Sequence, residues 1–282
     1  MRMKKILFLF ILVNFVSDLM AQQSPYGSLN VLSYNIRYNN PGDSINAWPN
    51  RKEWVKSLIK FYDTDIFCIQ EGLSDQVDFL QTAIGFAVEG VGRDDGKRAG
   101  EFTAIYYNPN RFVKRGSGHF WLSDTPDIPS KGWDAAIVRI CTWVHLYDKL
   151  RKQEFFVFNT HYDHVGVVAR LKSSELIQKQ IPLIAGNFPV ILTGDLNVTP
   201  ETESVGIIKS FMSDAREVSK EPPYGPEGSF SGFKFNAPLK ERIDYIFASK
   251  QFKVLKFGIL SDSKDQRYPS DHLPVLARLR IE

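Results

Sequence analysis

The sequence predicts an α/β fold, with one domain in which two packed, mixed β-sheets are flanked by outer helices. Strand-like runs alternate with helix-like stretches from about residue 29 almost to the C-terminal end. No low-complexity linker or internal repeat interrupts this alternation. Apolar residues make up 43% of the 282 residues and charged residues 24%, which is ordinary for a globular protein with a sizeable core. We therefore predict a single domain over residues 22–282.

The predicted strands are short apolar runs rich in β-branched or aromatic residues. They cover residues 29–36, 65–69, 102–107, 138–146, 155–159, 189–193, 242–248, 252–260 and 273–281. The runs 138–146 and 155–159 follow each other across a charged turn, which predicts antiparallel pairing. Strands separated by helices predict that the sheets are mixed.

Two segments have the periodicity of helices that cover a sheet. Residues 51–61 and 171–185 each place apolar side chains on one helical face, namely Trp54, Val55, Leu58 and Ile59, and Leu171, Ile177, Ile181 and Ile184.

The first 21 residues have the layout of a secretory signal peptide. Arg2, Lys4 and Lys5 precede an apolar run over residues 6–16, and Ala21 closes the segment. The apolar run is too short to span a bilayer comfortably. A buried N-terminal helix is disfavoured by the basic start and by the polar residues 22–24. We predict a signal peptide over residues 1–21, export to the periplasm or the medium, and no transmembrane segment in the mature chain.

The charge of the predicted mature chain is close to zero. The whole sequence carries +3, and residues 1–21 contribute three basic residues and one acidic residue, so residues 22–282 carry +1. A dedicated nucleic-acid binder usually has a broad basic surface. The charge therefore weakens a nuclease interpretation without excluding it.

Cysteine use does not indicate a disulfide scaffold, which would need more than two cysteines. Cys68 and Cys141 each lie inside an apolar, strand-like run. Two buried free thiols are the favoured interpretation, and a bond between them in an exported protein stays open.

Polar side chains of the kinds used in catalysis stand at the ends of the predicted strands. In Pro-Val-Ile-Leu-Thr-Gly-Asp-Leu-Asn, Asp195 and Asn197 are two residues apart, so in an extended segment they point the same way. The other members of the set are Asn35, Glu71, His161, Asp244, Asp271 and His272. A turn, a cap or a satisfied buried carboxylate would explain any one of them. Eight together indicate an active site, because active sites gather at strand ends on α/β scaffolds.

With these motifs the chain resembles the endonuclease/exonuclease/phosphatase superfamily, the fold of deoxyribonuclease I. The motifs appear in family order as Ser-Tyr-Asn35, Gln-Glu71, Asn-Thr-His161, Gly-Asp195-Leu-Asn197, Arg-Ile-Asp244-Tyr-Ile and Ser-Asp271-His272-Leu-Pro. The resemblance covers roughly residues 29–282. It implies a four-layer α/β sandwich and hydrolysis of a phosphate ester with Mg²⁺ or Mn²⁺.

The chemistry of three residues agrees with such a metal site. Glu71 and Asp271 offer hard carboxylate oxygens and Asn35 an amide oxygen, a set that suits an ion with few protein ligands and several waters. Cysteine and histidine clusters with zinc spacing are absent from the sequence, which disfavours Zn²⁺. The metal would neutralise charge on a phosphate oxygen and on the leaving-group oxygen.

The predicted nucleophile is a water, because no serine, threonine or cysteine stands in these motifs as an attacking group. His272 titrates near neutral pH and can take a proton, and Asp244 would fix its tautomer. Asp195 would orient the water or receive its proton, so the roles of His272 and Asp195 could be exchanged.

The remaining two residues face the phosphate in this scheme. Asn197 would donate to a non-bridging phosphate oxygen. His161 would contact the phosphate from the other side or protonate the leaving group. The Asn-Thr-His form resembles deoxyribonuclease I, sphingomyelinases and deadenylases rather than abasic-site endonucleases.

Two loops carry weaker signals about the substrate. The glycine-rich loop 90–102 holds Arg98, which is either an anion contact or a solvated charge. Trp121 and Trp133 flank a turn-rich segment and form either an aromatic wall for a ligand or part of the core.

Three functions stay open at this point. The first is an exported, metal-dependent phosphodiesterase or phosphatase acting on a small-molecule or lipid-headgroup ester. The second is a secreted DNA or RNA nuclease, including a deadenylase-like exonuclease. The third is a non-catalytic binding module, which the complete polar set disfavours. No stable protein partner is implied.

Overall fold

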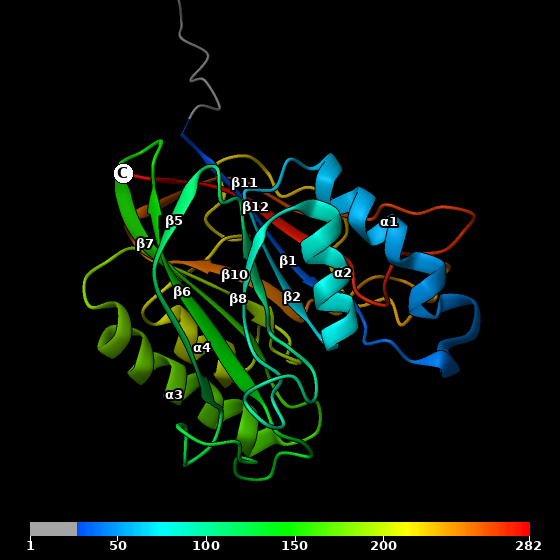
Figure 1. The fold of residues 1–282 in the computed structure, drawn as a ribbon, viewed down its shortest axis with the longest axis horizontal. Coiled ribbons are helices and arrows are strands. Elements are labelled where there is room, and N and C mark those ends of the chain that lie inside the picture. Colours follow the sequence, from blue (N-terminus) through cyan, green and yellow to red (C-terminus); the bar gives the residue numbers. More distant parts are fainter. Residues whose placement is uncertain (1–26) are drawn as a thin grey trace, which may run out of the picture.

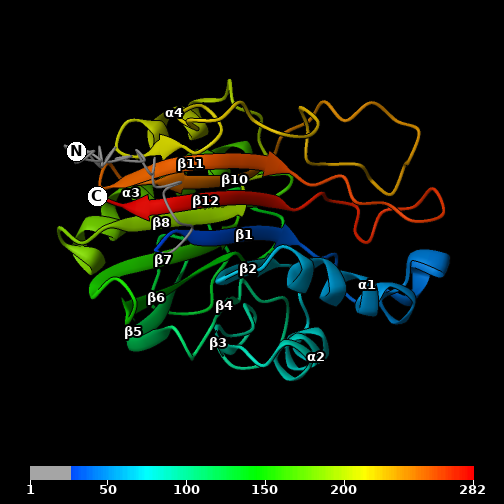
Figure 2. The ribbon, with the colours of Figure 1, turned by 90° about the horizontal axis from the view of Figure 1, so that it is seen from above.

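The computed structural model describes residues 27–282, so the predicted signal peptide lies outside the described residues. The chain forms two six-stranded mixed sheets that pack face to face, with helices on both outer sides (Figures 1 and 2). This confirms the predicted four-layer α/β sandwich.

The first sheet has the strand order β11-β12-β1-β2-β4-β3. Its strand β1 is parallel to β2 and antiparallel to β12. The bounds are β1 (Leu29–Asn35), β2 (Ile66–Gln70), β3 (Ala87–Glu89), β4 (Ile105–Tyr107), β11 (Phe252–Ile259) and β12 (Val275–Ile281).

The second sheet has the strand order β5-β6-β7-β8-β10-β9. Strand β7 is antiparallel to β6, as predicted, and parallel to β8, which in turn pairs antiparallel with β10. The bounds are β5 (Phe112–Trp121), β6 (Ile140–Asp148), β7 (Gln153–His161), β8 (Val190–Asp195), β9 (Ser213–Asp214) and β10 (Asp244–Ala248).

The helices divide between the two outer faces (Figure 1). Helices α1 (Trp48–Phe61) and α2 (Ser74–Ile84) cover the first sheet, and α3 (Val167–Ala185) and α4 (Glu203–Lys209) cover the second. A short 3₁₀ helix, η1 (Pro41–Asn46), precedes α1. Within residues 27–282, no helix combines the length and the apolar character needed to cross a membrane.

Three apolar layers hold the sandwich together, and the central one joins the two sheets. Val31 and Ile66 of the first sheet and Val157 and Ile246 of the second are fully buried in this layer. Strands buried on both faces become continuous apolar runs, which is why they could be recognised in the sequence. Truncating one of these side chains to alanine typically costs about 2–5 kcal/mol.

The structure confirms the nine predicted strands and both predicted helices, with bounds that differ by a few residues. It adds strands β3, β5 and β9 and helices α2 and α4. Strand β5 was missed because it is an edge strand with a polar, exposed middle. Its Gly118 lies beneath the Trp143 ring, where a Cβ atom would come within 2.7 Å of the ring. The glycine that weakens the strand pattern is therefore required by packing.

Candidate active site

The first sheet brings four of the predicted residues to one end of the sandwich. Asn35 is the last residue of β1, and Glu71 directly follows β2, which is parallel to β1. Asp271 and His272 precede β12, which is antiparallel to β1, so the start of β12 lies beside the end of β1. The parallel and antiparallel pairing of these strands therefore brings all four residues to the same end of the sheet.

The second sheet brings the other four residues to the same end. His161 and Asp195 are the last residues of the parallel strands β7 and β8 and lie opposite each other in register. Asp244 opens the antiparallel strand β10 directly opposite Asp195. Asn197 follows β8 by two residues.

Two contacts join the halves across the interface between the sheets. His272 Nδ1 lies 2.9 Å from Asp244 Oδ2. Asn35 Nδ2 donates to Asp195 Oδ2 at 2.9 Å. All four of these side chains are buried. Neither sheet alone therefore contains the site.

A pocket of about 470 Å³ opens over these strand ends. Six of the eight predicted residues line it, and Asn35 and Asp244, both 0% exposed, lie beneath. The full lining is Arg37, Tyr38, Glu71, Glu101, Ile137, Arg139, His161, His164, Asp195, Asn197, Phe230, Asp271 and His272.

His272, Asp244 and Asp195 form a buried group of titratable side chains. Burial alone would lower the pKa of His272, but the carboxylates of Asp244 and Asp195 hold it well above its ordinary value. Burial, reinforced by Asp244 and opposed by His272, raises the pKa of Asp195 to about 7. The predicted proton exchange with a water stays a prediction, and the assignment of the base between His272 and Asp195 stays open.

His161 has the opposite electrostatic setting. Its Nε2 atom lies 3.1 Å from Asn197 Nδ2 and 3.5 Å from Asp195 Oδ2. Burial lowers the pKa of His161 well below 6.5, and the neighbouring cations Arg139 and Arg93 lower it further. This setting favours the uncharged imidazole, and the two predicted roles of His161 stay predictions.

The prediction that Asp195 and Asn197 share one face of an extended strand was wrong. The strand ends at Asp195, and Asn197 has a left-handed backbone with φ of 51°. Its backbone N–H donates to Asp195 Oδ1 at 2.9 Å and its side-chain amide donates to the Tyr162 carbonyl at 3.0 Å. A tight turn, rather than an extended strand, brings both side chains to the pocket.

Glu71 and Asp271 provide a carboxylate pair that fits a divalent cation. The Arg37 guanidinium lies 3.9 Å from each carboxylate. Burial and the nearby Glu71 raise the pKa of Asp271, whereas His272 and Arg37 oppose this rise. Both carboxylates offer oxygen donors of the kind a hard ion takes, and Glu71 also accepts from the Asn35 amide at 2.9 Å and from the Tyr38 backbone N–H at 3.2 Å.

The predicted role of Asn35 is not tested by its contacts. Its Nδ2 group donates to Glu71 Oε1 as well as to Asp195, and its Oδ1 atom accepts the Arg37 N–H at 3.0 Å. Among the described residues, one set of three carboxylate or imidazole groups has its ligand atoms within 4.8 Å of one another, and it is Asp195, Asp244 and His272. The predicted set of Asn35, Glu71 and Asp271 therefore stays a prediction.

Four arginine, glutamate or histidine residues of the pocket were missed in the sequence: Arg37, Glu101, Arg139 and His164. Arg139 is 4% exposed, and its Nε and Nη1 atoms have no hydrogen-bond partner. Its Nη2 atom lies 3.1 Å from His164 Nδ1, and Glu101 and Asp163 lie within 4.0 Å. A single arginine inside the apolar run 138–146 was the signal that could have revealed it.

The loop residues Arg98, Trp121 and Trp133, which were weak candidates for substrate contact, do not line the pocket. Arg98 pairs with Asp78 at the surface, and Trp121 is buried with its Nε1 atom donating to the Arg93 carbonyl. Trp133 lies at a separate surface hollow and donates to Asp124.

Cys68 and Cys141 are buried free thiols, as predicted.

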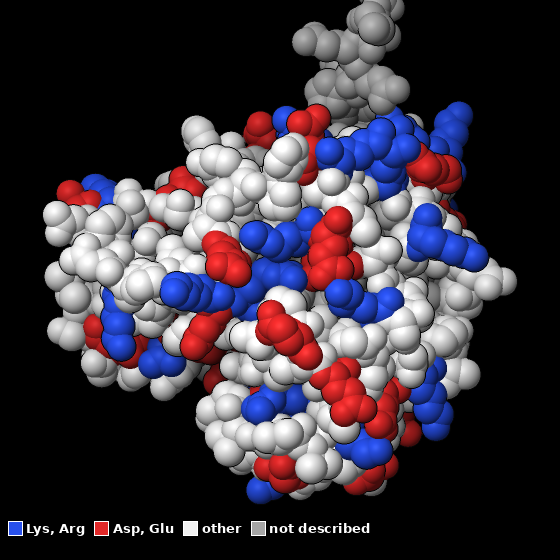
Figure 3. All heavy atoms as spheres, turned by 180° about the vertical axis from the view of Figure 1, so that it is seen from behind, with Lys and Arg blue, Asp and Glu red and all other residues white. Residues whose placement is uncertain are grey.

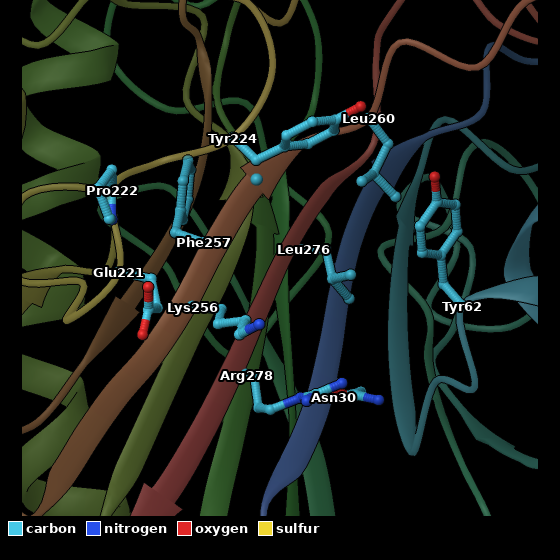
Figure 4. A pocket seen from close by; sticks show the side chains of 11 residues that line it. Asn30, Tyr62, Glu221, Pro222, Tyr224, Lys256, Phe257, Leu260, Leu276 and Arg278 are labelled. Atoms are coloured by element: carbon cyan, nitrogen blue, oxygen red, sulfur yellow. The ribbon is translucent and has the colours of Figure 1, made fainter.

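A second hollow, of about 400 Å³, lies over the first sheet beside β11, β12 and β1 (Figure 4). Tyr62 and Tyr224 lie toward one end, Leu276 lies near the middle, and Lys256 and Arg278 lie toward the other end (Figure 4). It contains none of the eight predicted residues. The pocket at the strand ends is therefore the candidate active site.

Comparisons with known proteins agree with this geometry. A mannosyl-6-phosphatase of Bacteroides thetaiotaomicron is 40% identical, covers 89% of this chain and 99% of its own, and superposes with a TM-score of 0.85. An endonuclease/exonuclease/phosphatase family protein of the same organism is 40% identical, covers 90% and 98%, and has a TM-score of 0.86. The uncharacterized protein L388 of Acanthamoeba polyphaga mimivirus is 31% identical over 60% of this chain and 67% of its own.

The sequence profile of the Endonuclease/Exonuclease/phosphatase family matches residues 32–272, which include all eight predicted site residues. With the two-sheet sandwich and its polar strand ends, this match shows that the chain belongs to the endonuclease/exonuclease/phosphatase family.

Proposed function

We propose that this protein is an exported, divalent-metal-dependent phosphatase whose substrate is a small phosphate ester, with a phosphorylated sugar as the first choice. The observation that carries the proposal is the content of one pocket. Within about 470 Å³ it combines a carboxylate pair, a buried imidazole–carboxylate group and a buried arginine. The name of the 40% identical mannosyl-6-phosphatase supports the sugar phosphate as the class to test first.

In this proposal one set of residues binds the metal ion and another exchanges the proton of the attacking water. Glu71, Asp271 and Asn35 would hold Mg²⁺ or Mn²⁺, which supplies charge neutralisation at the phosphate. His272 and Asp195 orient a water and exchange its proton, and Asp244 holds the His272 ring through Nδ1.

The phosphate would lie against the opposite wall of the pocket. Asn197 and His161 line that side, and Arg139 adds positive charge there, although its guanidinium also lies within 4.0 Å of Glu101 and Asp163. A phosphate monoester carries up to two negative charges, which suits a wall that holds an arginine.

A polynucleotide substrate has less support. On the face shown in Figure 3, Lys and Arg side chains lie in several groups, the larger ones near the centre and at the upper right, and Asp and Glu side chains are interspersed among them. The predicted mature chain carries only +1. A long anionic polymer would therefore gain little from non-specific attraction.

A substrate screen tests the proposal. Purified protein with Mg²⁺ or Mn²⁺ would be assayed against mannose 6-phosphate, glucose 6-phosphate, glycerol phosphate, a lipid-headgroup diester, and single-stranded DNA and RNA. We expect the highest kcat/KM with a sugar phosphate and no turnover in excess chelator. Faster cleavage of DNA or RNA than of every small ester would show that the nuclease alternative is correct.

Export is a separate part of the proposal, since it rests on the sequence of residues 1–21. Expression of the full chain followed by cell fractionation and N-terminal sequencing would test it. We expect a product outside the cytoplasm that begins near Gln22. A full-length protein retained in the cytoplasm would contradict export while leaving the phosphatase proposal intact.

A further inference from the structure

The three predicted metal ligands come from three separate segments that strand pairing aligns only in part. Asn35 ends β1, Glu71 follows β2 and Asp271 precedes β12. The β1–β2 ladder extends to Asn35 and Gln70, but Glu71 and Asp271 lie outside the strands. Other contacts must hold these three segments in place.

Arg51, on helix α1, bonds two of these segments. The side chain is 3% exposed, and its donors all reach backbone carbonyls. Nη1 donates to the carbonyl of Ile36 and, at 3.2 Å, to that of Pro269, and Nη2 donates to the carbonyl of Arg37 at 2.8 Å. The segment after Asn35 is thereby tied to the segment before Asp271.

Gln76, on helix α2, bonds the third segment to the first. It is 0% exposed, and its Nε2 group donates to the Arg37 carbonyl at 2.9 Å. Its Oε1 atom accepts the N–H of Asn39 at 2.7 Å and that of Leu73 at 3.0 Å. The segment that carries Glu71 is thereby tied to the segment that follows Asn35.

The carbonyl of Arg37 is the junction of this network, because both Arg51 and Gln76 donate to it. Arg37 has a left-handed backbone with φ of 56°, and Glu71 has one with φ of 65°. Such conformations are costly for non-glycine residues and persist only where the surroundings hold them. The buried side chains of Arg51 and Gln76, which both donate to the Arg37 carbonyl, provide that restraint.

We propose that Arg51 and Gln76 are positioning residues that set the geometry, and thereby the affinity, of the divalent-ion site formed by Asn35, Glu71 and Asp271. The proposal rests on the metal dependence in the proposed function. Neither side chain touches the pocket, so both act through the backbone segments that carry the ligands. Removal of residues that orient metal ligands typically weakens metal binding about 10- to 100-fold.

Binding of Mn²⁺ to the whole protein, followed by electron paramagnetic resonance, tests the proposal without relying on activity. Gln76→Leu and Arg51→Met remove the bonds, and we expect the affinity to fall about 10- to 100-fold. Gln76→Glu keeps both acceptor contacts but places a carboxylate oxygen against the Arg37 carbonyl, so we expect a loss of affinity here too. Arg51→Lys keeps the charge but not the forked geometry, so we expect a smaller loss.

The matched control is Gln178→Leu, an exposed glutamine on α3 whose Nε2 group donates to Ser210 at 2.9 Å. We expect wild-type Mn²⁺ affinity for this variant. Thermal unfolding in chelator, run on every variant, separates loss of fold from loss of metal binding. Gln76→Glu and Arg51→Lys nearly conserve volume, so folded protein remains available if the apolar variants fail to fold.

Glu71→Gln distinguishes failure of this inference from failure of the proposed function. If wild-type protein binds Mn²⁺, Glu71→Gln loses it, and folded Gln76 and Arg51 variants keep wild-type affinity, the positioning proposal is wrong. If wild-type protein does not bind Mn²⁺, or Glu71→Gln binds it equally well, the metal assignment itself is wrong and the positioning proposal falls with it.

Discussion

His272 and Asp244 meet across the interface of the two sheets, with Nδ1 and Oδ2 2.9 Å apart. His272 precedes β12 of the first sheet and Asp244 opens β10 of the second. The other ring nitrogen, His272 Nε2, lies 3.7 Å from Asp195 Oδ2 and 3.4 Å from Asn35 Nδ2. The tautomer and the orientation of the imidazole therefore depend on both sheets.

Removal of this imidazole should slow the chemical step. His272→Ala is expected to lower kcat by about 10² to 10⁴, the usual span for a general acid or base. Asp244→Asn should give a related loss, and the double variant should lose little more, because the two side chains act as one unit. His145→Ala, which alters a histidine that pairs with Glu154 outside the pocket, serves as the control. Near-normal kcat in both single variants would contradict this mechanism.

Activity should depend on a divalent ion held by Glu71. Excess chelator is expected to abolish turnover, and Mg²⁺ or Mn²⁺ should restore it. Glu71→Ala should raise the metal concentration needed for half-maximal activity, because it removes one of two adjacent carboxylates. Full activity of the wild-type enzyme in excess chelator would rule out the metal site.

Arg139 should bind the phosphate. A hydrogen bond to a charged group contributes about 1.5–3 kcal/mol, so Arg139→Met is expected to raise KM for a sugar phosphate at least about tenfold. Arg139→Lys should be intermediate, since lysine lacks the planar fork. Arg98→Met, in the exposed loop, is the matched control. An unchanged KM in folded Arg139→Met would place the phosphate elsewhere in the pocket.

Salt should have little effect on KM. A nuclease that grips six or more phosphates loses about 10³ or more in affinity between about 50 and 200 mM salt through counterion release. The small pocket and the charge of +1 predict contact with few phosphates. KM for a sugar phosphate measured across this range checks the expectation. A steep salt dependence together with efficient cutting of DNA or RNA would instead indicate a nuclease.

Asp163 should stabilise the fold above about pH 4. Burial works against its charged form, but backbone N–H groups, including those of Gly166 and Val165, lower its pKa to about 2. Because the folded pKa is below the unfolded value of about 3.9, this stabilisation is present above that value and is lost as the pH falls toward 2.

Urea unfolding in chelator would measure this linkage. Asp163→Asn should be less stable than wild type at about pH 6, and the difference should shrink at about pH 3. A difference that does not change with pH would show that the carboxylate charge is not responsible.

The strands and the site motifs were predictable from sequence because they leave local patterns. A strand such as β8, buried on both faces, must be apolar, and the polar residue that ends it, Asp195, then stands out. Edge strand β5 leaves no such pattern, because neighbours cover only its ends. Two partners of Asp195, His161 and Asn35, are 34 and 160 residues away in the sequence, so no local window could show them.

The pocket wall was harder to predict than the eight polar residues at the strand ends. Arg139 is recognisable only once His164 and Glu101, from two other segments, are seen to converge on it. Asn197 shows a different limit, since period-two reasoning assumed an extended chain where the backbone turns. Motifs thus identified the participants, whereas tertiary packing determined their geometry.

Because each sheet carries half of the site, catalysis should report on how the two sheets are docked. A slide of one sheet over the other by a fraction of an ångström would alter the His272–Asp244 and Asn35–Asp195 contacts at once. We therefore expect substitutions such as Ile246→Val, in the apolar layer between the sheets, to change turnover although Ile246 does not line the pocket. The packing of the central core sets the relative position of the two sheets, so changes far from the pocket are expected to alter activity.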